Sequence, residues 1–121
     1  MIGDVLYMKS AKARKQRKRM FNATLNVKQK LVAAHLSKEM KTQLKKRSLP
    51  IRKGDEVKVL RGKFKGTSGK VTKVDLKRAE IFVDSIKRKR INGEETQVAI
   101  HPSNFVITNA DMNDSKRIKK R

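Results

Sequence analysis

Residues 52–71 decide the fold, and they read RKGDEVKVLRGKFKGTSGKV. Val57 and Val59 alternate with polar residues, and Val71 and Val74 repeat this period of two further along the chain. Such alternation is typical of short β-strands that turn one face toward a core. Three turn-forming glycines separate the two strands: Gly62, Gly66 and Gly69.

More short strands follow this segment. We expect them at residues 80–84, at residues 86–91 before an Asn92-Gly93 turn, at residues 97–100, and at residues 105–108 after a turn at residues 101–104. Short strands joined by glycine turns predict a mainly β fold, a small SH3-like barrel over residues 51–109. Phe82 and Phe105 lie in strand patterns, so we expect both in the core.

The preceding residues, 1–50, predict a basic N-terminal extension with short helices. Asn26 and Gln29 resemble a capping box that would open a helix running to Leu36, and Ser37 would cap a second helix at residues 39–46. Pro50 disfavours helix at the residue before it, which sets the boundary of the barrel. Residues 110–121 would form a basic C-terminal tail.

The composition demands a negatively charged partner. The chain has 121 residues and a formal net charge of +22. Proteins with this excess of Lys and Arg bind nucleic acid by displacing counterions from phosphates. No apolar run is long enough to span a membrane, and the absence of Cys excludes disulfides and agrees with a reducing, intracellular setting.

The charge is densest in residues 9–19, which we call the basic arm. It holds no acidic residue and seven basic ones: Lys9, Lys12, Arg14, Lys15, Arg17, Lys18 and Arg19. So many like charges cannot pack into a core, and we expect the arm to be disordered or extended until phosphates neutralise it. A solvated tail that only aids solubility is the alternative.

A second basic element is the loop between the first two predicted strands. Glycines let its backbone approach another backbone closely, and the loop presents Arg61, Lys63 and Lys65. Phe64 could stack on a base or pack against the barrel, and Arg88, Lys89 and Arg90 could clamp RNA or occupy a solvated edge. The complete set of predicted RNA contacts is Lys12, Arg14, Lys15, Arg17, Lys18, Arg19, Arg47, Arg52, Arg61, Lys63, Phe64, Lys65, Lys70, Arg88, Lys89, Arg90 and His101.

Catalysis and metal binding are not expected. His35 and His101 are the two imidazoles and lack further ligands at metal spacing. The neighbouring carboxylates Asp55 and Glu56 have no nucleophile beside them, and Asp55 reads as a surface or turn-capping residue. His101 can serve structurally, in a turn with Ser103. We therefore predict neither an enzyme nor a cofactor.

Residues 52–71 resemble a KOW motif, the hairpin found in ribosomal proteins and in NusG-type elongation factors. The ordered segments around it sharpen this resemblance: residues 15–18, 21–23, 34–39, 47–55, 74–78 and 101–104. Together they resemble the universal L24 family of large-subunit ribosomal proteins, in its archaeal and eukaryotic branch, called L26 in eukaryotes. Residues 1–7 do not resemble the start of that family, so we expect Met8 to be the native initiator.

The resemblance implies a structural constituent of the large ribosomal subunit. It would bind the large-subunit, 23S-type rRNA directly near its 5′ end, help to initiate assembly, and lie near the peptide exit tunnel among neighbouring ribosomal proteins. No membrane contact and no homo-oligomer are expected. The alternative is a KOW-type regulatory binding module of a transcription or translation complex.

Overall fold

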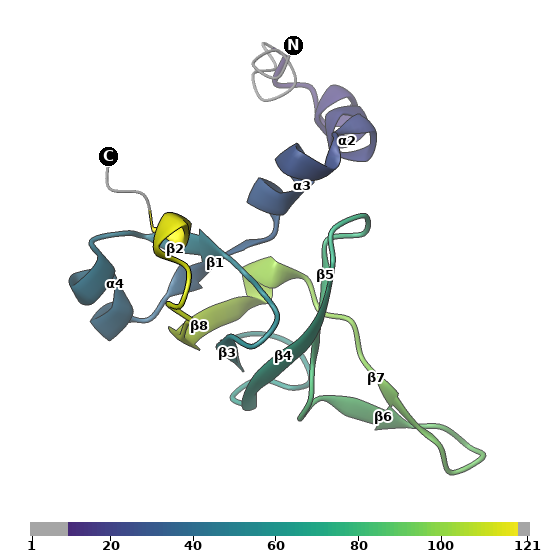
Figure 1. The fold of residues 1–121 in the computed structure, drawn as a ribbon. Helices are drawn as coiled ribbons and strands as arrows, with labels where there is room; N and C mark the ends of the chain where they lie inside the picture. Colours follow the sequence, from purple (N-terminus) through teal and green to yellow (C-terminus); the bar gives the residue numbers. More distant parts are fainter. Residues whose placement is uncertain (1–9, 119–121) are drawn as a thin grey trace.

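The computed structural model describes residues 10–118 (Figure 1), and the predictions on Met8 and Lys9 lie outside this range. The elements in chain order are α2 (Ala13–Asn22), α3 (Leu25–Leu31), β1 (Ala33–Leu36), α4 (Lys38–Leu44), β2 (Ser48–Pro50), β3 (Glu56–Val59), β4 (Ser68–Asp75), β5 (Glu80–Val83), β6 (Lys87–Lys89), β7 (Glu95–Gln97), the 3-10 turn η1 (Pro102–Asn104), β8 (Phe105–Asn109) and the 3-10 turn η2 (Ser115–Arg117). The expected class is confirmed, since the chain is mainly β and its helices precede most of the strands.

The strands form a six-stranded sheet in the order β2-β1-β8-β3-β4-β5 and a separate hairpin, β6-β7. β3 pairs antiparallel with β8 and with β4, and β1 pairs parallel with β8 through His35 and Leu36. Because β1 and β2 belong to the sheet, it includes residues on both sides of Pro50. The division into an extension, a barrel and a tail therefore stays a prediction.

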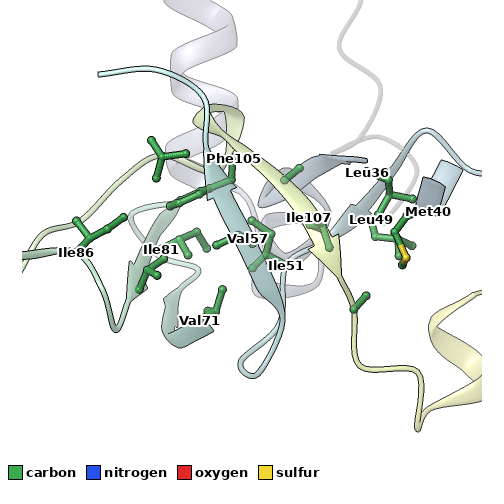
Figure 2. Packing of buried hydrophobic residues seen from close by; sticks show 14 residues of the cluster. Leu36, Met40, Leu49, Ile51, Val57, Val71, Ile81, Ile86, Phe105 and Ile107 are labelled. Atoms are coloured by element: carbon green, nitrogen blue, oxygen red, sulfur yellow. The ribbon is translucent and has the colours of Figure 1, made fainter. Parts of the chain in front are cut away.

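One hydrophobic core lies against this sheet (Figure 2). Phe105 and Ile107 of β8 pack with Val57 of β3 and Ile81 of β5, and all four are at most 1% exposed. Alternate residues of each strand supply these side chains, as the period of two predicted. Phe105 is a core residue as expected.

Phe82 is not a core residue, contrary to our expectation. Its neighbours Ile81 and Val83 face the core, so Phe82 points to the opposite side of β5, where it is half-buried. The Nζ atom of Lys73 lies 5.6 Å from the centre of its ring. Because side chains alternate between the two faces of a strand, the burial of Ile81 and Val83 excludes Phe82 from the core.

Two expectations about the N-terminal half are wrong. The helix expected to reach Leu36 ends at Leu31, because residues 33–36 leave it to pair with β8 and bury Ala34 and Leu36. Its N-cap is Thr24, not Asn26. The arm is not extended, because residues 13–22 form the helix α2. Arg, Lys, Gln, Met and Ala all favour helix, which overrides the charge argument locally.

The predictions of the second helix and of the turns at two glycines are confirmed. Ser37 caps α4 by accepting a hydrogen bond from the backbone N–H of Met40, as predicted. Gly62 and Gly66 adopt φ values of +95° and +86°, as turn glycines do. Gly69 is not in a turn but in β4, where a Cβ atom would lie 2.7 Å from Val83 Cγ1.

The last hairpin also differs in detail from the expectation. Its first strand, β6, lies within the predicted residues 86–91, and Gly93 turns the chain with a φ of +91°. The return strand is β7, residues 95–97, rather than residues 97–100. Ile100 instead forms an isolated bridge with Ile81, which ties the base of the hairpin to the sheet.

Candidate nucleic-acid interface

The loop between β3 and β4 is a compact basic turn. The backbone N–H of Gly66 donates to the carbonyl of Val59 at 2.8 Å, and that of Lys65 donates to Gly62 at 3.2 Å. These bonds close the loop on itself, so that Arg61, Lys63 and Lys65 are exposed while the side chain of Phe64 packs against the core. The loop therefore presents several positive charges on a rigid base.

The β6-β7 hairpin supplies the second set of charges. Arg88 and Lys89 lie on β6, and Arg90 lies at the start of the turn, all exposed. Lys87 forms an ion pair of 3.7 Å with Glu95 on the opposite strand. Figure 1 shows this hairpin projecting away from the sheet, so its charges extend the reach of the domain.

A groove of about 640 Å³ joins the loop to the hairpin. Its lining, which we call the basic groove, comprises Lys63, Phe64, Lys87, Arg88, Lys89 and Val98. Four of these residues belong to the set predicted from sequence, drawn from two segments more than twenty positions apart. None of the six lining residues is acidic, and no acidic residue occurs between residues 57 and 74.

The helix α2 carries a separate basic surface. Arg14, Lys15, Arg17 and Lys18 are exposed on it, no residue of α2 is buried, and Lys12 is its N-cap residue without a side-chain cap. Like charges three and four residues apart destabilise an isolated helix. Figure 1 shows α2 well apart from the β6-β7 hairpin, so the predicted contacts form two surfaces rather than one.

The remaining predicted residues lie elsewhere. Arg47 is exposed before β2, and Lys70 is exposed on β4. Arg52 forms an ion pair within the protein, because its Nη1 atom lies 3.1 Å from Asp114 Oδ2. His101 caps η1, where its Nδ1 atom accepts the backbone N–H of Ser103 at 3.2 Å and pairs with the Ser103 hydroxyl at 2.8 Å. The structural use of His101 is therefore observed.

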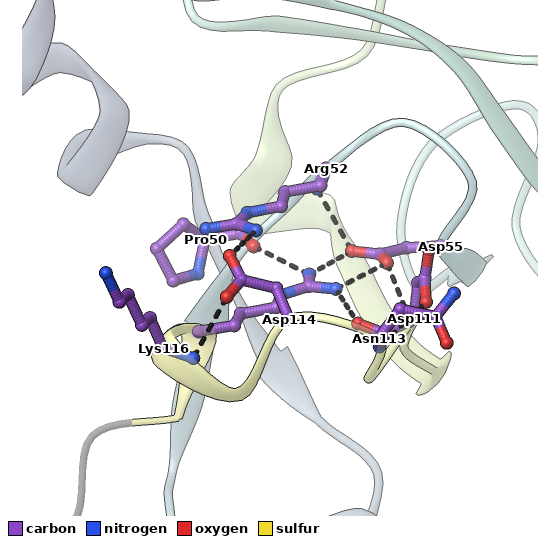
Figure 3. Close-up of polar contacts among 8 residues, drawn as sticks. Pro50, Arg52, Asp55, Asp111, Asn113, Asp114 and Lys116 are labelled. Atoms are coloured by element: carbon purple, nitrogen blue, oxygen red, sulfur yellow. Dashed lines mark hydrogen bonds and ion pairs between the residues drawn. The ribbon is translucent and has the colours of Figure 1, made fainter.

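Sequence reasoning missed one buried polar cluster, shown in Figure 3. Asp55 is fully buried, so a surface position is wrong for it, whereas turn capping is confirmed because its carboxylate accepts the backbone N–H of Arg52 at 3.0 Å. The same carboxylate accepts hydrogen bonds from both terminal nitrogens of Arg117. Arg117 also donates to the carbonyls of Pro50 at 3.0 Å and Asp111 at 2.9 Å. The C-terminal segment thus packs against the β domain. In the sequence, the single acidic residue between Gly54 and β3 was the only indication of this contact.

A neighbouring pair reinforces this docking. Asp114 accepts a hydrogen bond from Arg52 and another from the backbone N–H of Lys116 at 3.0 Å. The Arg52 hydrogen bond, followed by that of Lys116, lowers the pKa of the Asp114 carboxyl below its ordinary value. This pair is about half exposed, so it adds less to stability than the buried pair.

The sequence of the chain matches a known protein family. A family model described as ribosomal proteins L26 of eukaryotes and L24p of archaea matches residues 10–120. The chain belongs to this family. It is accordingly a protein of the large ribosomal subunit in the cytoplasm, and the resemblance proposed from the ordered sequence segments is confirmed.

Within residues 10–118 of this L26/L24p family member, no helix is long and apolar enough to cross a membrane. The same residues contain no group of three or more His, Asp or Glu side chains that could hold a metal ion.

Proposed function

We propose that this ribosomal protein binds large-subunit rRNA directly, through the basic groove and through α2. One observation carries the proposal: Lys63 and Phe64 of the β3-β4 loop line the same groove as Arg88 and Lys89 of the hairpin. Cationic side chains beside an aromatic ring suit phosphate contacts together with base contacts.

The two surfaces have different parts in this proposal. The basic groove lies between the β3-β4 loop and the β6-β7 hairpin, so it would fix the position of the protein on one RNA segment. The helix α2 has no buried residue, and its charges repel one another, so RNA phosphates would stabilise it by neutralisation. Each bound Lys or Arg would let two phosphate strands approach each other more closely.

The family resemblance supports a finer proposal. The rRNA segment would lie near the 5′ end of the molecule, binding would occur early in subunit assembly, and the assembled protein would lie near the peptide exit tunnel beside other large-subunit proteins. The predicted contacts at Arg47, Arg52, Lys70 and His101 belong to this proposal. Arg52 and His101 would bind RNA only through the polar atoms left free by their internal hydrogen bonds.

The test replaces Lys63 and Lys65 with Glu. The control replaces Lys38 and Lys41 of α4, which are exposed and do not line the basic groove, so that the net charge changes equally. The probe is a transcript of the 5′ third of the large-subunit rRNA, titrated at several salt concentrations.

We expect the loop variant to bind more weakly and its plot of log affinity against log salt to be shallower, by roughly 0.7 to 0.9 for each phosphate that the variant no longer binds. Assembly of large subunits should be delayed on sucrose gradients. Equal effects of the loop variant and the α4 control would contradict a main contact at the loop.

A regulatory KOW module is the competing function, and sedimentation of cell lysate separates the two. A structural ribosomal protein remains in large subunits at constant stoichiometry through a high-salt wash. A mostly free pool would favour the regulatory module. Family membership favours the ribosomal function.

A further inference from the structure

We propose that a second, apolar groove on this protein captures one unstacked nucleobase of the bound RNA. The groove has a volume of about 290 Å³ and lies between α2, α3 and the β4-β5 turn. Its apolar walls are Met20, Phe21, Leu31 and Leu76, and we call it the apolar groove. The proposal rests on the proposed function, because it names how RNA bound along α2 continues onto the domain.

The exposure of Phe21 indicates that a ligand binds in the apolar groove. The chain has four Phe residues, and three have an internal role: Phe105 is buried, Phe64 packs against the core, and Phe82 lies under Lys73. Phe21 is 82% exposed, and Met20 beside it is 47% exposed. A contiguous exposed apolar patch rimmed by polar residues, in a concave site, is typical of a binding surface.

The rim of the groove favours an anionic ligand. Lys28 of α3 and Lys77 and Arg78 of the β4-β5 turn line it, with Glu80 as the one carboxylate. An aromatic face surrounded by cations is the arrangement by which proteins hold unpaired bases, since the ring stacks on the base while the cations meet its phosphates. An apolar side chain of a protein partner would use the walls but not this excess of positive charge.

The apolar groove adjoins the basic residues of α2, which also favours RNA as its ligand. Met20 and Phe21 are in the last turn of α2, directly after its basic residues, and no acidic residue occurs between residues 5 and 38. A strand whose phosphates contact Arg14 to Lys18 therefore reaches the apolar groove without crossing a negative surface. A nucleic acid fits this path better than a protein partner does.

The opposite wall is held in a defined conformation. The carboxylate of Asp75 accepts the backbone N–H groups of Lys77 at 3.1 Å and Arg78 at 3.4 Å. Ala79 follows with a φ of +54°, an unfavourable value for a residue that carries a Cβ atom. The turn is thus fixed with both cations at the rim, and backbone strain of this kind concentrates at binding sites.

Two of the segments that carry the family resemblance contribute to the apolar groove. Residues 21–23 and residues 74–78 have no part in the basic groove, yet the apolar groove brings Phe21 and Leu76 together from these two segments. Ala23 is buried at the end of α2, which fixes the chain where Phe21 projects. The base would stack on Phe21 and contact Leu76.

The absence of Trp from the chain makes a direct test available. Phe21→Trp places a single indole at the groove, and Met112→Trp, in the C-terminal segment, is the control because Met112 does not line the groove. The probes are a 12-nucleotide oligoadenylate and an abasic 12-mer of equal backbone charge. We expect oligoadenylate to quench the indole of Phe21→Trp, and neither the abasic probe nor the control variant to show quenching.

Affinity provides the second measurement. The wild-type protein should bind oligoadenylate roughly five- to tenfold more tightly than the abasic probe, as stacking of one base allows. Phe21→Ala should remove most of this preference and leave the salt dependence unchanged, because the same phosphates are contacted. Met112→Ala, at an exposed apolar residue that lines neither groove, is the matched variant and should retain the preference.

The outcomes separate the two proposals. Failure of the wild-type protein to bind either probe at low salt would overturn direct RNA binding itself. Equal affinity for the two probes without quenching, or a base preference that survives Phe21→Ala, would overturn base capture and leave phosphate binding intact. Loss of a neighbouring protein, but not of RNA, from particles carrying Phe21→Ala would assign the apolar groove to a protein contact instead.

Discussion

Replacing Arg117 with Ala should destabilise the whole β domain, although the residue lies near the C-terminus of the chain. Arg117 is 7% exposed, and its guanidinium donates four hydrogen bonds, two to Asp55 and one each to the carbonyls of Pro50 and Asp111. Asp55 is positioned independently, because it also accepts the backbone N–H groups of Arg52 at 3.0 Å and Asp111 at 3.1 Å.

The expected cost follows from this geometry. Removing one partner of a buried ion pair costs about 3 to 5 kcal/mol, because the other charge is left without compensation. The value here should fall at the lower end for two reasons. The C-terminal segment can undock and let water reach Asp55, and the Nε atom of Arg117 has no hydrogen-bond partner among the described residues, so the native pair is itself imperfect. We expect a loss of about 3 kcal/mol, which lowers the urea midpoint by roughly 2 M for a slope near 1.5 kcal/mol per M.

Urea denaturation followed by far-UV circular dichroism measures this loss, and a double-mutant cycle with Asp55→Asn measures the coupling. The two substitutions should be non-additive by at least about 1.5 kcal/mol. The matched control is Arg52→Ala, which breaks the half-exposed pair with Asp114 and should cost at most about 1 kcal/mol. A cost below about 1 kcal/mol for Arg117→Ala, or additivity within about 0.5 kcal/mol, would refute the argument.

Three further predictions concern the strands, the tail and the arm. Gly69→Ala should destabilise the protein by about 1 to 3 kcal/mol in urea, because the new Cβ would lie 2.7 Å from Cγ1 of the buried Val83 and displace that side chain in the core; a cost below about 0.5 kcal/mol would count against this. The lowered pKa of Asp114 means that its contribution to stability is present above the unfolded-state pKa and is lost as pH falls through the folded-state value. The stability difference between wild type and Asp114→Asn should therefore shrink below about pH 4, and a constant difference in acid titrations would contradict it. Inorganic polyphosphate should raise the helix content of the chain by stabilising α2, added salt should reverse the gain, and an unchanged circular dichroism spectrum would be the opposing result.

The strands were predictable because their pattern is local. Val57 and Val59 alternate with exposed residues, Gly62 and Gly66 adopt the positive φ that their turn requires, and Phe105 begins a strand after a capped turn. Each of these features is decided within a few residues. The positive charge of the β3-β4 loop and of the β6-β7 hairpin was equally predictable from the sequence. The structure shows in addition that the loop and the hairpin line one groove.

The errors at residues 33–36 and at Asp55 arose because distant contacts decide the structure there. Residues 33–36 have a helical composition, and they become β1 only because β8, some seventy residues later, offers a free edge and a core for Ala34 and Leu36. The groove at Phe21 depends likewise on the distant β4-β5 turn. Such contacts leave no trace in the spacing of nearby residues, since tertiary packing overrides local propensity.

The acidic residues explain how a chain of this charge folds and still presents its cations. Asp55 binds Arg117 in the core, Asp114 binds Arg52, and Asp75 and Asp84 accept backbone N–H groups at turns. These carboxylates are thus used to hold the chain together rather than to neutralise its surface. The long stretches without any acid, residues 5–38 and 57–74, include the helix α2 and the β3-β4 loop. The positive charge is therefore greatest where the fold places no internal anion, and those are the surfaces that require an external polyanion.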